Sequence, residues 1–400
     1  MSENKFIRNE VRAVAVLSLG FGLVGIDRFL IATMYPTIAR DLNLGYGDIG
    51  VITGALALAW GFAALVMGNV ADRIGQRRVL VGSLVIFSLL IGGSGLAAGL
   101  GGLVLVRIVM GFADGAFTPA SISATVQVSP PERHGRNVGF QQTMLVLFGL
   151  GLSPLFVGFL LHEGVDWRYI FLVFTLPGLV LAWATWKIIP SISPDIALAK
   201  GGVTDDWREV LSYRNIPFLM AGMFCWLTCL ITMSAFMPSY MMDHLKLDIG
   251  QMGTVMSGIG FGAMVGTIAL STLSDTIGRK PVMIMSSVGA LTGLILLGMI
   301  GANVWLLFAV VFAINFFNNA LITLTVGPIA TETVPVRLMT TASGIVIAAG
   351  ELLGGGVAPI IGGQIAQKFG ISHILWAPTV MMAGGVLLCL LIKETNPKFI

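Results

Sequence analysis

Twelve apolar stretches of roughly 20 residues follow one another along the 400 residues of this chain. An α-helix rises about 1.5 Å per residue, so a stretch of about 20 residues crosses a hydrocarbon core about 30 Å thick. The sequence therefore predicts an all-α integral membrane protein. Its twelve transmembrane helices are expected at residues 13–36, 49–71, 79–100, 103–127, 138–161, 168–189, 216–241, 252–274, 282–301, 304–327, 341–366 and 372–393.

The composition excludes a soluble protein and several classes of function. The chain is 56% hydrophobic and 11% charged, with a mean hydropathy of +0.91, which is far from the balance of soluble domains. The three cysteines all fall in apolar stretches, so we expect neither a disulfide nor a metal site. The sequence contains no phosphate-binding signature and no nucleophile–base constellation, so we expect no ATP drive, no cofactor, no nucleic-acid partner and no enzyme activity.

The basic residues between the apolar stretches predict the orientation in the membrane. Seventeen lysines and arginines fall in one set of alternate loops and four in the other. Lysine and arginine accumulate on the cytoplasmic side, and an even number of spans returns the chain to its starting side. We therefore expect both termini in the cytoplasm, in a plasma membrane that is the bacterial inner membrane.

The chain repeats itself about halfway. "YPTIARDLNLGYGDIG" from Tyr35 is echoed by "MPSYMMDHLKLDIGQMG" from Met237, and Pro154 is matched by Pro359. We predict two pseudo-symmetric six-helix halves at residues 1–190 and 216–400, joined by a cytoplasmic linker at 191–215 with a short amphipathic helix. Two such halves allow a site between them to open alternately to each side of the membrane.

Two loops at equivalent places in the halves share one pattern. The loop after the second stretch reads "GNVADRIGQRR" and its partner reads "STLSDTIGRKP". Both resemble the signature loop of the major facilitator superfamily, and this resemblance implies the major facilitator fold. It also implies a gating role for the residues that match: Gly68, Asp72, Arg73, Gly75, Arg77, Asp275, Gly278 and Arg279.

The first and fourth stretches carry a narrower resemblance. "DRFLIATMYP" from Asp27 and "RIVMGFADGAFTP" from Arg107 are similar to the anion:cation symporter family, whose members carry organic acids. The chain departs from that family's pattern at Asp114, where the family usually has Glu. The resemblance implies transport of an organic anion with a cation.

The charged residues in these two stretches suit that chemistry. An ionised side chain near the bilayer centre costs about 2.5–3.5 kcal/mol, so four of them need a reason. Arginine offers a planar donor fork to a carboxylate, which makes Arg28 and Arg107 candidates for substrate binding. A buried carboxyl can exchange a proton, which makes Asp27 and Asp114 candidates for proton coupling. The alternative is that the four form static pairs between the first and fourth helices.

Further polar residues lie inside apolar stretches. Gln142, Asn315, Asn318 and Asn319 are candidate substrate ligands, and Glu351 is a candidate second proton site. Each has a simpler alternative: hydrogen bonding between helices for the amides, and a helix-packing carboxyl for Glu351.

We therefore expect a monomeric secondary transporter that takes up an organic anion with H⁺ as the coupling ion by alternating access. The anion could be a sugar acid, an aromatic acid or a small carboxylate. A proton-coupled exporter of drugs or metabolites is the main alternative, supported by Glu351 and a methionine-rich interior. A membrane sensor or scaffold is a third reading.

Overall fold

The computed structural model describes residues 3–190 and 203–396 as helices joined by short loops, with no strand among them. Some side chains within these ranges lie outside the description: those of residues 3–8, 64–74, 132, 203–206, 336 and 340. The chain divides into two compact units, Met1–Leu44 with Ala55–Leu198, and Gly45–Gly54 with Ala199–Ile400. Each unit is described by itself below.

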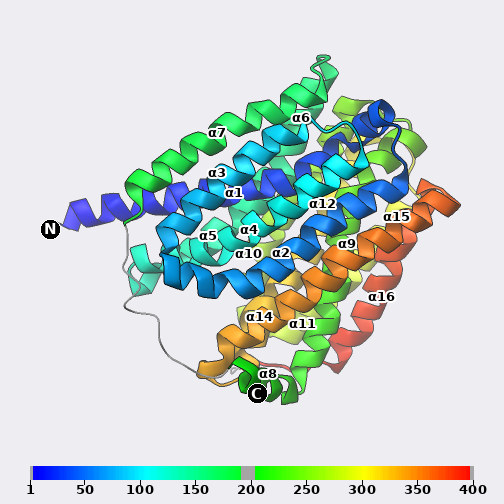
Figure 1. Cartoon of the computed structure of the whole chain (residues 1–400). Helices are drawn as coiled ribbons and strands as arrows, with labels where there is room; N and C mark the ends of the chain where they lie inside the picture. Colours follow the sequence, from blue (N-terminus) through cyan, green and yellow to red (C-terminus); the bar gives the residue numbers. More distant parts are fainter. Residues whose placement is uncertain (1–2, 191–202, 397–400) are drawn as a thin grey trace. The chain divides into compact units, whose positions relative to one another are not determined.

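The first unit is built from the helices of the N-terminal half (Figure 1). Long apolar helices pack side by side, and a short helical break marks its fifth span. Its elements are α1 Glu3–Leu42, α2 Tyr46–Ile74, α3 Gln76–Ser94, α4 Leu100–Val128, η1 Pro131–Arg133, α5 His134–Val146, η2 Leu147–Leu152, α6 Ser153–His162 and α7 Trp167–Ile188.

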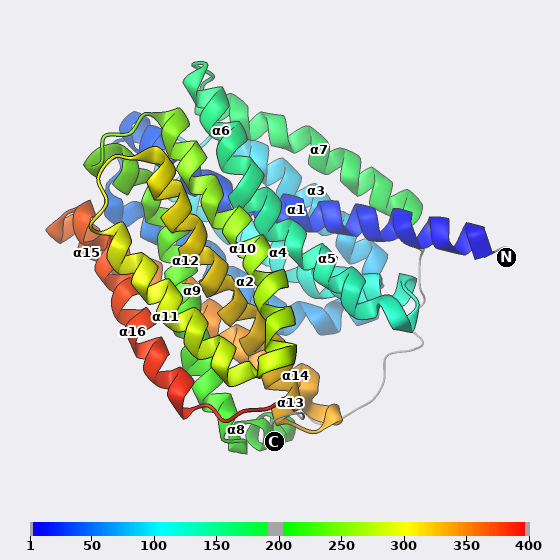
Figure 2. The ribbon, with the colours of Figure 1, turned by 180° about the vertical axis from the view of Figure 1, so that it is seen from behind.

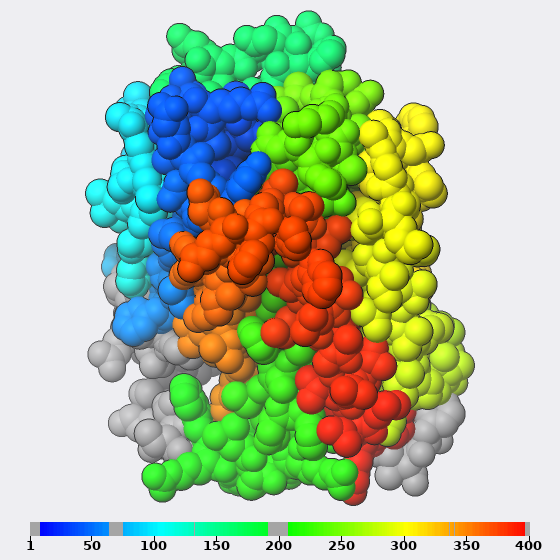
Figure 3. Space-filling model, turned by 90° about the vertical axis from the view of Figure 1, so that its right-hand side faces the viewer, coloured from blue at the N-terminus to red at the C-terminus, as the bar shows by residue number. Residues whose placement is uncertain are grey.

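The second unit repeats this order. α16 runs beside α9 and α11 in it, as Figures 2 and 3 show for the red, green and yellow segments. Its elements are α8 Val203–Ser212, α9 Asn215–Ser239, η3 Tyr240–His244, α10 Ile249–Ile277, α11 Arg279–Leu297, α12 Val304–Leu324, η4 Thr325–Ile329, α13 Ala330–Thr333, η5 Val336–Leu338, α14 Met339–Ala349, η6 Gly350–Val357, α15 Ala358–Phe369, η7 Ile371–Leu375 and α16 Trp376–Leu391.

The predicted fold class is confirmed. Within the described residues, twelve helical segments are long and apolar enough to cross a membrane. The helix α8 lies where the sequence predicts an amphipathic helix, while residues 191–202 of the predicted linker are outside the described part. The boundaries of the two halves stay a prediction. The first turns of α2, residues 45–54, group with the second unit rather than with the rest of their helix.

A wide helical turn precedes the matched prolines in both units. The π-helical segment η2 ends at Leu152, two residues before Pro154, and η6 ends at Val357, two residues before Pro359. Proline has no N–H to donate and its ring clashes with the carbonyl four residues earlier. The wider turn accommodates this clash, so the fifth and eleventh spans each change course at the same place.

The two halves also share a carboxylate–arginine pair near the start of the first helix of each. In the first unit, Glu10 accepts hydrogen bonds from Arg133 at 3.0 Å and from Asn137 at 2.9 Å. In the second unit, Glu209 of α8 accepts a hydrogen bond from Arg337. The Glu10 side chain is 3% exposed, whereas that of Glu209 is 37% exposed. The carboxylate is therefore buried in the first half, beside an Arg133 side chain that is 37% exposed, whereas both partners are open to solvent in the second half.

This difference predicts unequal effects of the same substitution. Glu10→Gln replaces a buried carboxylate that accepts hydrogen bonds from Arg133 and Asn137, and we expect the loss of these charge-assisted bonds to lower the free energy of unfolding by about 2 kcal/mol. Glu209→Gln, the matched control, removes a solvent-exposed pair and should cost less than about 1 kcal/mol. Thermal unfolding of the purified variants in detergent measures both, and equal losses would contradict the assignment.

Candidate functional site

Glycines allow close approach between helices of the first unit. A Cβ atom on Gly25 of α1 would stand 2.2 Å from the Leu145 carbonyl oxygen of α5, and one on Gly149 of η2 would stand 2.4 Å from the Gly25 carbonyl oxygen. Gly111 of α4 lies against α2, where an added Cβ would stand 2.5 Å from the Leu56 carbonyl oxygen and 3.0 Å from the Trp60 nitrogen. Side chains on α1, α2 and α4 can therefore meet.

The central contact at this crossing is an ion pair between α1 and α4. Nη1 of Arg107 donates a hydrogen bond to the backbone carbonyl oxygen of Asp27 at 2.8 Å and lies 3.4 Å from Asp27 Oδ1. Both side chains are 1% exposed. The geometry is incomplete, because Arg107 Nε and Nη2 and Asp27 Oδ2 are buried with no hydrogen-bond partner among the described residues.

Asp114 lies next to this pair. It is fully buried, and neither carboxyl oxygen receives a hydrogen bond from a described donor. The Asp27 carboxyl and the guanidinium groups of Arg107 and Arg28 lie near enough to act on it electrostatically. Two neighbouring carboxylates repel each other when both are ionised, so a proton on one of the two relieves the repulsion.

Arg28, the neighbour of Asp27 in sequence, points toward α2. Its guanidinium carbon lies 4.0 Å from the centroid of the Trp60 ring and 5.7 Å from that of Phe29. The side chain is 9% exposed. A cation over an aromatic face is attracted by the ring's negative charge, so Trp60 fixes the plane of this guanidinium. The roughly 100° between Asp27 and Arg28 on the helix thus gives each a different neighbour.

The four charged residues form one cluster, which we call the α1–α4 charge cluster: Asp27, Arg28, Arg107 and Asp114. The structure brings together all four residues that the sequence singled out in these two helices. With both carboxyls ionised the cluster is neutral, and with one proton added it carries one positive charge. In a low-dielectric setting such a change of charge strongly alters the affinity for an anion.

The two glutamines of the fifth span differ in their surroundings. Gln141 is buried, donates to Ser121 at 2.5 Å and accepts from Thr125 at 2.9 Å, so it ties α5 to α4. Gln142, the predicted substrate ligand, is exposed. An exposed amide is accessible to a ligand, and the role of Gln142 as a substrate ligand stays a prediction.

The three asparagines of α12 all donate hydrogen bonds, two of them to other helices. Asn318 donates to the backbone carbonyl of Trp226 on α9 at 3.1 Å, and Asn319 donates to Thr267 on α10 at 2.7 Å. Asn315 donates to a carbonyl of its own helix at 2.9 Å. The side-chain oxygens of Asn315 and Asn318 are buried without a described donor. The structure thus separates the trio instead of directing it to one point, which favours the packing alternative.

Glu351 lies in η6 and is half-buried. The sequence places this acid inside the eleventh apolar stretch, and the structure leaves its side chain partly exposed. The wide turn that precedes Pro359 changes the direction of the side chains around it, which the periodicity of a regular α-helix does not predict.

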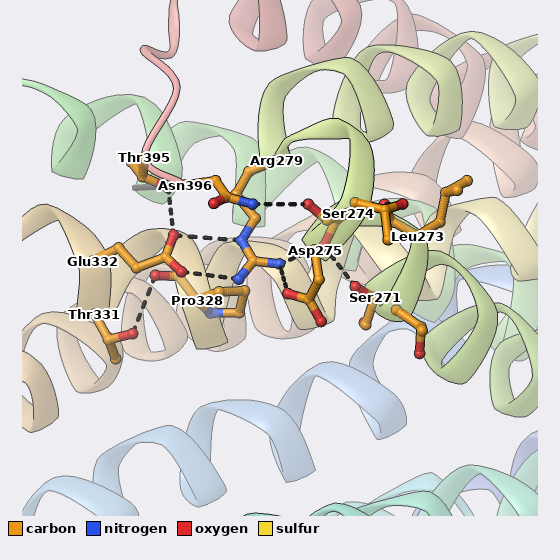
Figure 4. Close-up of polar contacts among 12 residues, drawn as sticks. Ser271, Leu273, Ser274, Asp275, Arg279, Pro328, Thr331, Glu332, Thr395 and Asn396 are labelled. Carbon is orange, nitrogen blue, oxygen red and sulfur yellow. Dashed lines mark hydrogen bonds and ion pairs between the residues drawn. The ribbon is translucent and has the colours of Figure 1, made fainter. Parts of the chain in front are cut away.

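The second signature loop holds an ion-pair network (Figure 4). Gly278 has a φ of 103°, which favours glycine at the turn from α10 to α11. The Arg279 guanidinium donates to Asp275 at 2.5 Å, to Ser274 at 2.6 Å and to Glu332 of α13 at 2.9 Å. Thr395 donates to the same Glu332 carboxylate at 2.7 Å, so the segment after α16 is tied to this network.

Glu394 anchors the start of α11 from that same segment. Its carboxylate accepts hydrogen bonds from the backbone N–H groups of Arg279, Lys280, Thr395 and Asn396, all at 2.9–3.0 Å. Burial raises the pKa of this carboxyl, but the backbone hydrogen bonds together outweigh burial and bring the pKa below its usual value.

The first signature loop is described in part. Gly68, Asp72 and Arg73 lie in the last turns of α2, and the side chains of Asp72 and Arg73 are outside the described residues. Gly75 has a φ of 97°, matching its counterpart Gly278. The guanidinium of Arg77 lies 4.1 Å from the ring centroid of Trp186 on α7.

Sequence reasoning missed Trp60, Glu332 and Glu394. Trp60 lies in an apolar stretch where an aromatic residue is ordinary, and its contact with Arg28 depends on how α1 and α2 pack. The signal for Glu332 and Glu394 was weak but present: both are acids at the ends of spans on the side where Arg279 lies.

Comparison with known proteins gives consistent results. A family model described as Major Facilitator Superfamily matches residues 17–269 and 232–399. The uncharacterized MFS-type transporter Rv1250 of Mycobacterium tuberculosis is 29% identical over 189 residues, which is 47% of this chain and 32% of that relative. The chain thus spans about a third of the length of Rv1250 in that match.

Two further matches extend over nearly the whole chain. The sialic acid transporter NanX of Escherichia coli is 24% identical over 393 residues, covering 95% of this chain and 92% of NanX. The crystal structure of a D-xylose-proton symporter superposes with a TM-score of 0.79 and 19% identity, covering 96% of this chain and 98% of that one. At that identity the solved structure shows a shared fold.

The ion pair predicts a non-additive pattern of stability. Arg107→Gln leaves the buried Asp27 carboxylate without its counter-charge and should lower the free energy of unfolding by about 3–5 kcal/mol. Adding Asp27→Asn removes that charge, so the double variant should be more stable than Arg107→Gln alone. Thermal unfolding of the parent, both single variants and the double variant measures the coupling. Additive losses would show that the two side chains do not interact.

Proposed function

We propose that this chain, which belongs to the major facilitator superfamily, takes up an organic anion together with a proton. It is a multi-pass membrane protein of a transporter family and not an enzyme. Small molecules are the cargo of this family. The anion, the proton and the inward direction are the parts that we propose, with the bacterial inner membrane as the location, both termini in the cytoplasm and a monomer as the working unit.

The observation that carries the proposal is the composition of the α1–α4 charge cluster. Two arginines and two aspartates are buried in one place, and the Asp114 carboxyl has no described donor. A static brace would be expected to satisfy its charges fully, because each unpaired buried charge costs several kcal/mol. An incompletely satisfied cluster instead suits groups that exchange partners during a cycle.

Charge neutrality links the proton to the anion. When a proton occupies the Asp27–Asp114 pair, the cluster carries one positive charge in excess, and Arg28 or Arg107 can engage a carboxylate. The loaded site is then neutral again. Unit charges about 4 Å apart at an effective dielectric constant of about 20 interact by about 4 kcal/mol, so either ligand strongly favours binding of the other. Coupling of this kind is reciprocal.

The organic-anion class is also supported by a relative. NanX, which matches along nearly the whole chain, is named for sialic acid, a sugar acid. Sugar acids, aromatic acids and small carboxylates all present the carboxylate that an arginine fork recognises. Gln142 of the fifth span is proposed to contact the rest of the substrate.

The loops supply the proposed gates. The Arg279 network joins α10, α11 and α13 by ion pairs, and the segment after α16 by the hydrogen bond from Thr395, at one end of the second unit. Opening that end requires these contacts to break. Glu351 is retained as a second proton site in this proposal, and the test of the exporter alternative is whether proton movement with cationic compounds needs it.

Asp114→Asn tests the coupling directly. The amide cannot take up or release a proton, so we expect proton-driven accumulation of the anion to fall at least 100-fold. Exchange of labelled for unlabelled anion across the membrane should persist, because the arginines remain. Proteoliposomes with and without an imposed pH gradient measure both. Unchanged accumulation would refute the role of Asp114, while loss of exchange as well would show that it has another role.

Trp60 provides a second test through Arg28. Trp60→Leu removes the aromatic face, and a cation–π contact contributes about 1 kcal/mol, so the half-saturation concentration of the anion should rise about 5-fold. Trp60→Phe, the matched control, keeps an aromatic face and should have a smaller effect. Uptake rates as a function of anion concentration measure this. Equal effects of Leu and Phe would assign Trp60 to packing only.

A further inference from the structure

A stripe of exposed, largely apolar side chains runs along one face of α7. Its side chains are exposed and recur every three or four residues, the spacing of one helix face. Such a face on a membrane helix contacts lipid. The stripe consists of Tyr169, Leu172, Val173, Leu176, Val180, Trp183 and Trp186.

The last two residues of the stripe are tryptophans, and a cationic side chain lies over the ring of each. The Arg77 guanidinium lies 4.1 Å from the ring centroid of Trp186, and the Lys187 ammonium lies 4.1 Å from that of Trp183. The two rings remain 50% and 60% exposed. Exposed tryptophans are typical of the level of the lipid headgroups, and a cation on the ring face is held at the same level.

Close packing of α3 on α7 keeps these groups together. Gly178 of α7 lies against Ser88 of α3, and a Cβ on Gly92 of α3 would lie 2.6 Å from the hydroxyl of Thr175. Because no larger residue fits at either place, the start of α3 is fixed beside the end of α7. Arg77 in the first turn of α3 therefore reaches Trp186.

The charge at this place is positive. Arg77, Arg78 and Lys187 gather here, and no acid lies in the first turn of α3. Of the side chains that the structure describes, none forms an ion pair with these three residues. The Nε atom of Arg77 is buried and has no described hydrogen-bond partner. The N-cap residue of α3 is Gly75, which has no side chain to cap the first N–H groups of the helix.

We propose that the α3–α7 end binds an anionic phospholipid. The phosphate pairs with Arg77 and Lys187 at the level of the tryptophan rings, and the acyl chains lie along the apolar stripe of α7. The combination of a cationic headgroup site with a continuous lipid-facing stripe fits a phospholipid better than a soluble anion, which would use only the first part. The basic residues predict that this end faces the cytoplasm, where anionic lipids attract basic groups.

Lipid binding to the purified full-length protein tests the proposal. Native mass spectrometry is performed in detergent with dioleoylphosphatidylglycerol or dioleoylphosphatidylcholine. We expect the first phosphatidylglycerol to bind at least 10-fold more tightly than phosphatidylcholine. Lys187→Gln combined with Arg77→Gln should remove that preference. Lys187→Arg should keep it, because the cation is retained.

Controls separate this site from general charge. Lys393→Gln removes an exposed lysine on the same predicted side and should leave binding unchanged. Trp183→Leu with Trp186→Leu keeps both cations, leaves the α3–α7 contact glycines in place and should weaken phosphatidylglycerol binding several-fold. Equal binding of the two lipids, or equal loss in Lys393→Gln and in the double charge variant, would overturn the proposal. Displacement of the lipid by millimolar glycerol phosphate would assign the site to free phosphate and overturn it as well.

Discussion

The contact between Arg107 and Asp27 is the interaction on which the rest of the first unit depends. Two opposite charges are buried between α1 and α4, in a place where neither tolerates being alone. Asp114 adds a second carboxyl and Arg28 a second cation, so the cluster has one more proton-binding group than the pair alone needs. A site that must stay near neutrality in a low-dielectric setting responds to each proton by changing its affinity for an anion. Under our proposal, this requirement for near-neutrality couples the binding of a proton to the binding of an anion.

The backbone contacts decide whether these charges meet. Gly25 and Gly149 let α1 and η2 touch, and Gly111 lets α4 approach α2. The wide turns before Pro154 and Pro359 bend the same spans in both units. Small residues and bends thus fix the approach of the helices, and the polar side chains occupy the places where the helices approach. The aromatic residues then orient the cations: Trp60 holds the face of Arg28, and Trp186 holds that of Arg77.

Much of the architecture could be predicted from the sequence, because a membrane imposes simple rules. The length of apolar stretches gives the twelve spans, and the cost of charge in lipid marks Asp27, Arg28, Arg107 and Asp114. What could not be predicted depends on the rotation and neighbours of each helix. Glu351 is half-buried and lies in η6, a segment whose departure from α-helical periodicity is not visible in the pattern of apolar residues. Asn318 and Asn319 donate hydrogen bonds to α9 and α10 respectively. Gln141 is buried and Gln142 is exposed, a difference that depends on how the helices pack. The ties of Glu332 and Glu394 to the Arg279 loop join residues far apart in sequence.

The central claim is that an organic anion and a proton move together through this protein. The most direct measurement is lumenal pH in proteoliposomes that contain the purified protein and a trapped pH dye, as a panel of organic acids and cationic drugs is added outside. The account predicts acidification with particular acids at a pH where they are ionised, above the passive leak, and its loss in Arg28→Ala and Arg107→Ala. Silence with every acid, together with proton movement that follows cationic compounds and requires Glu351, would contradict it.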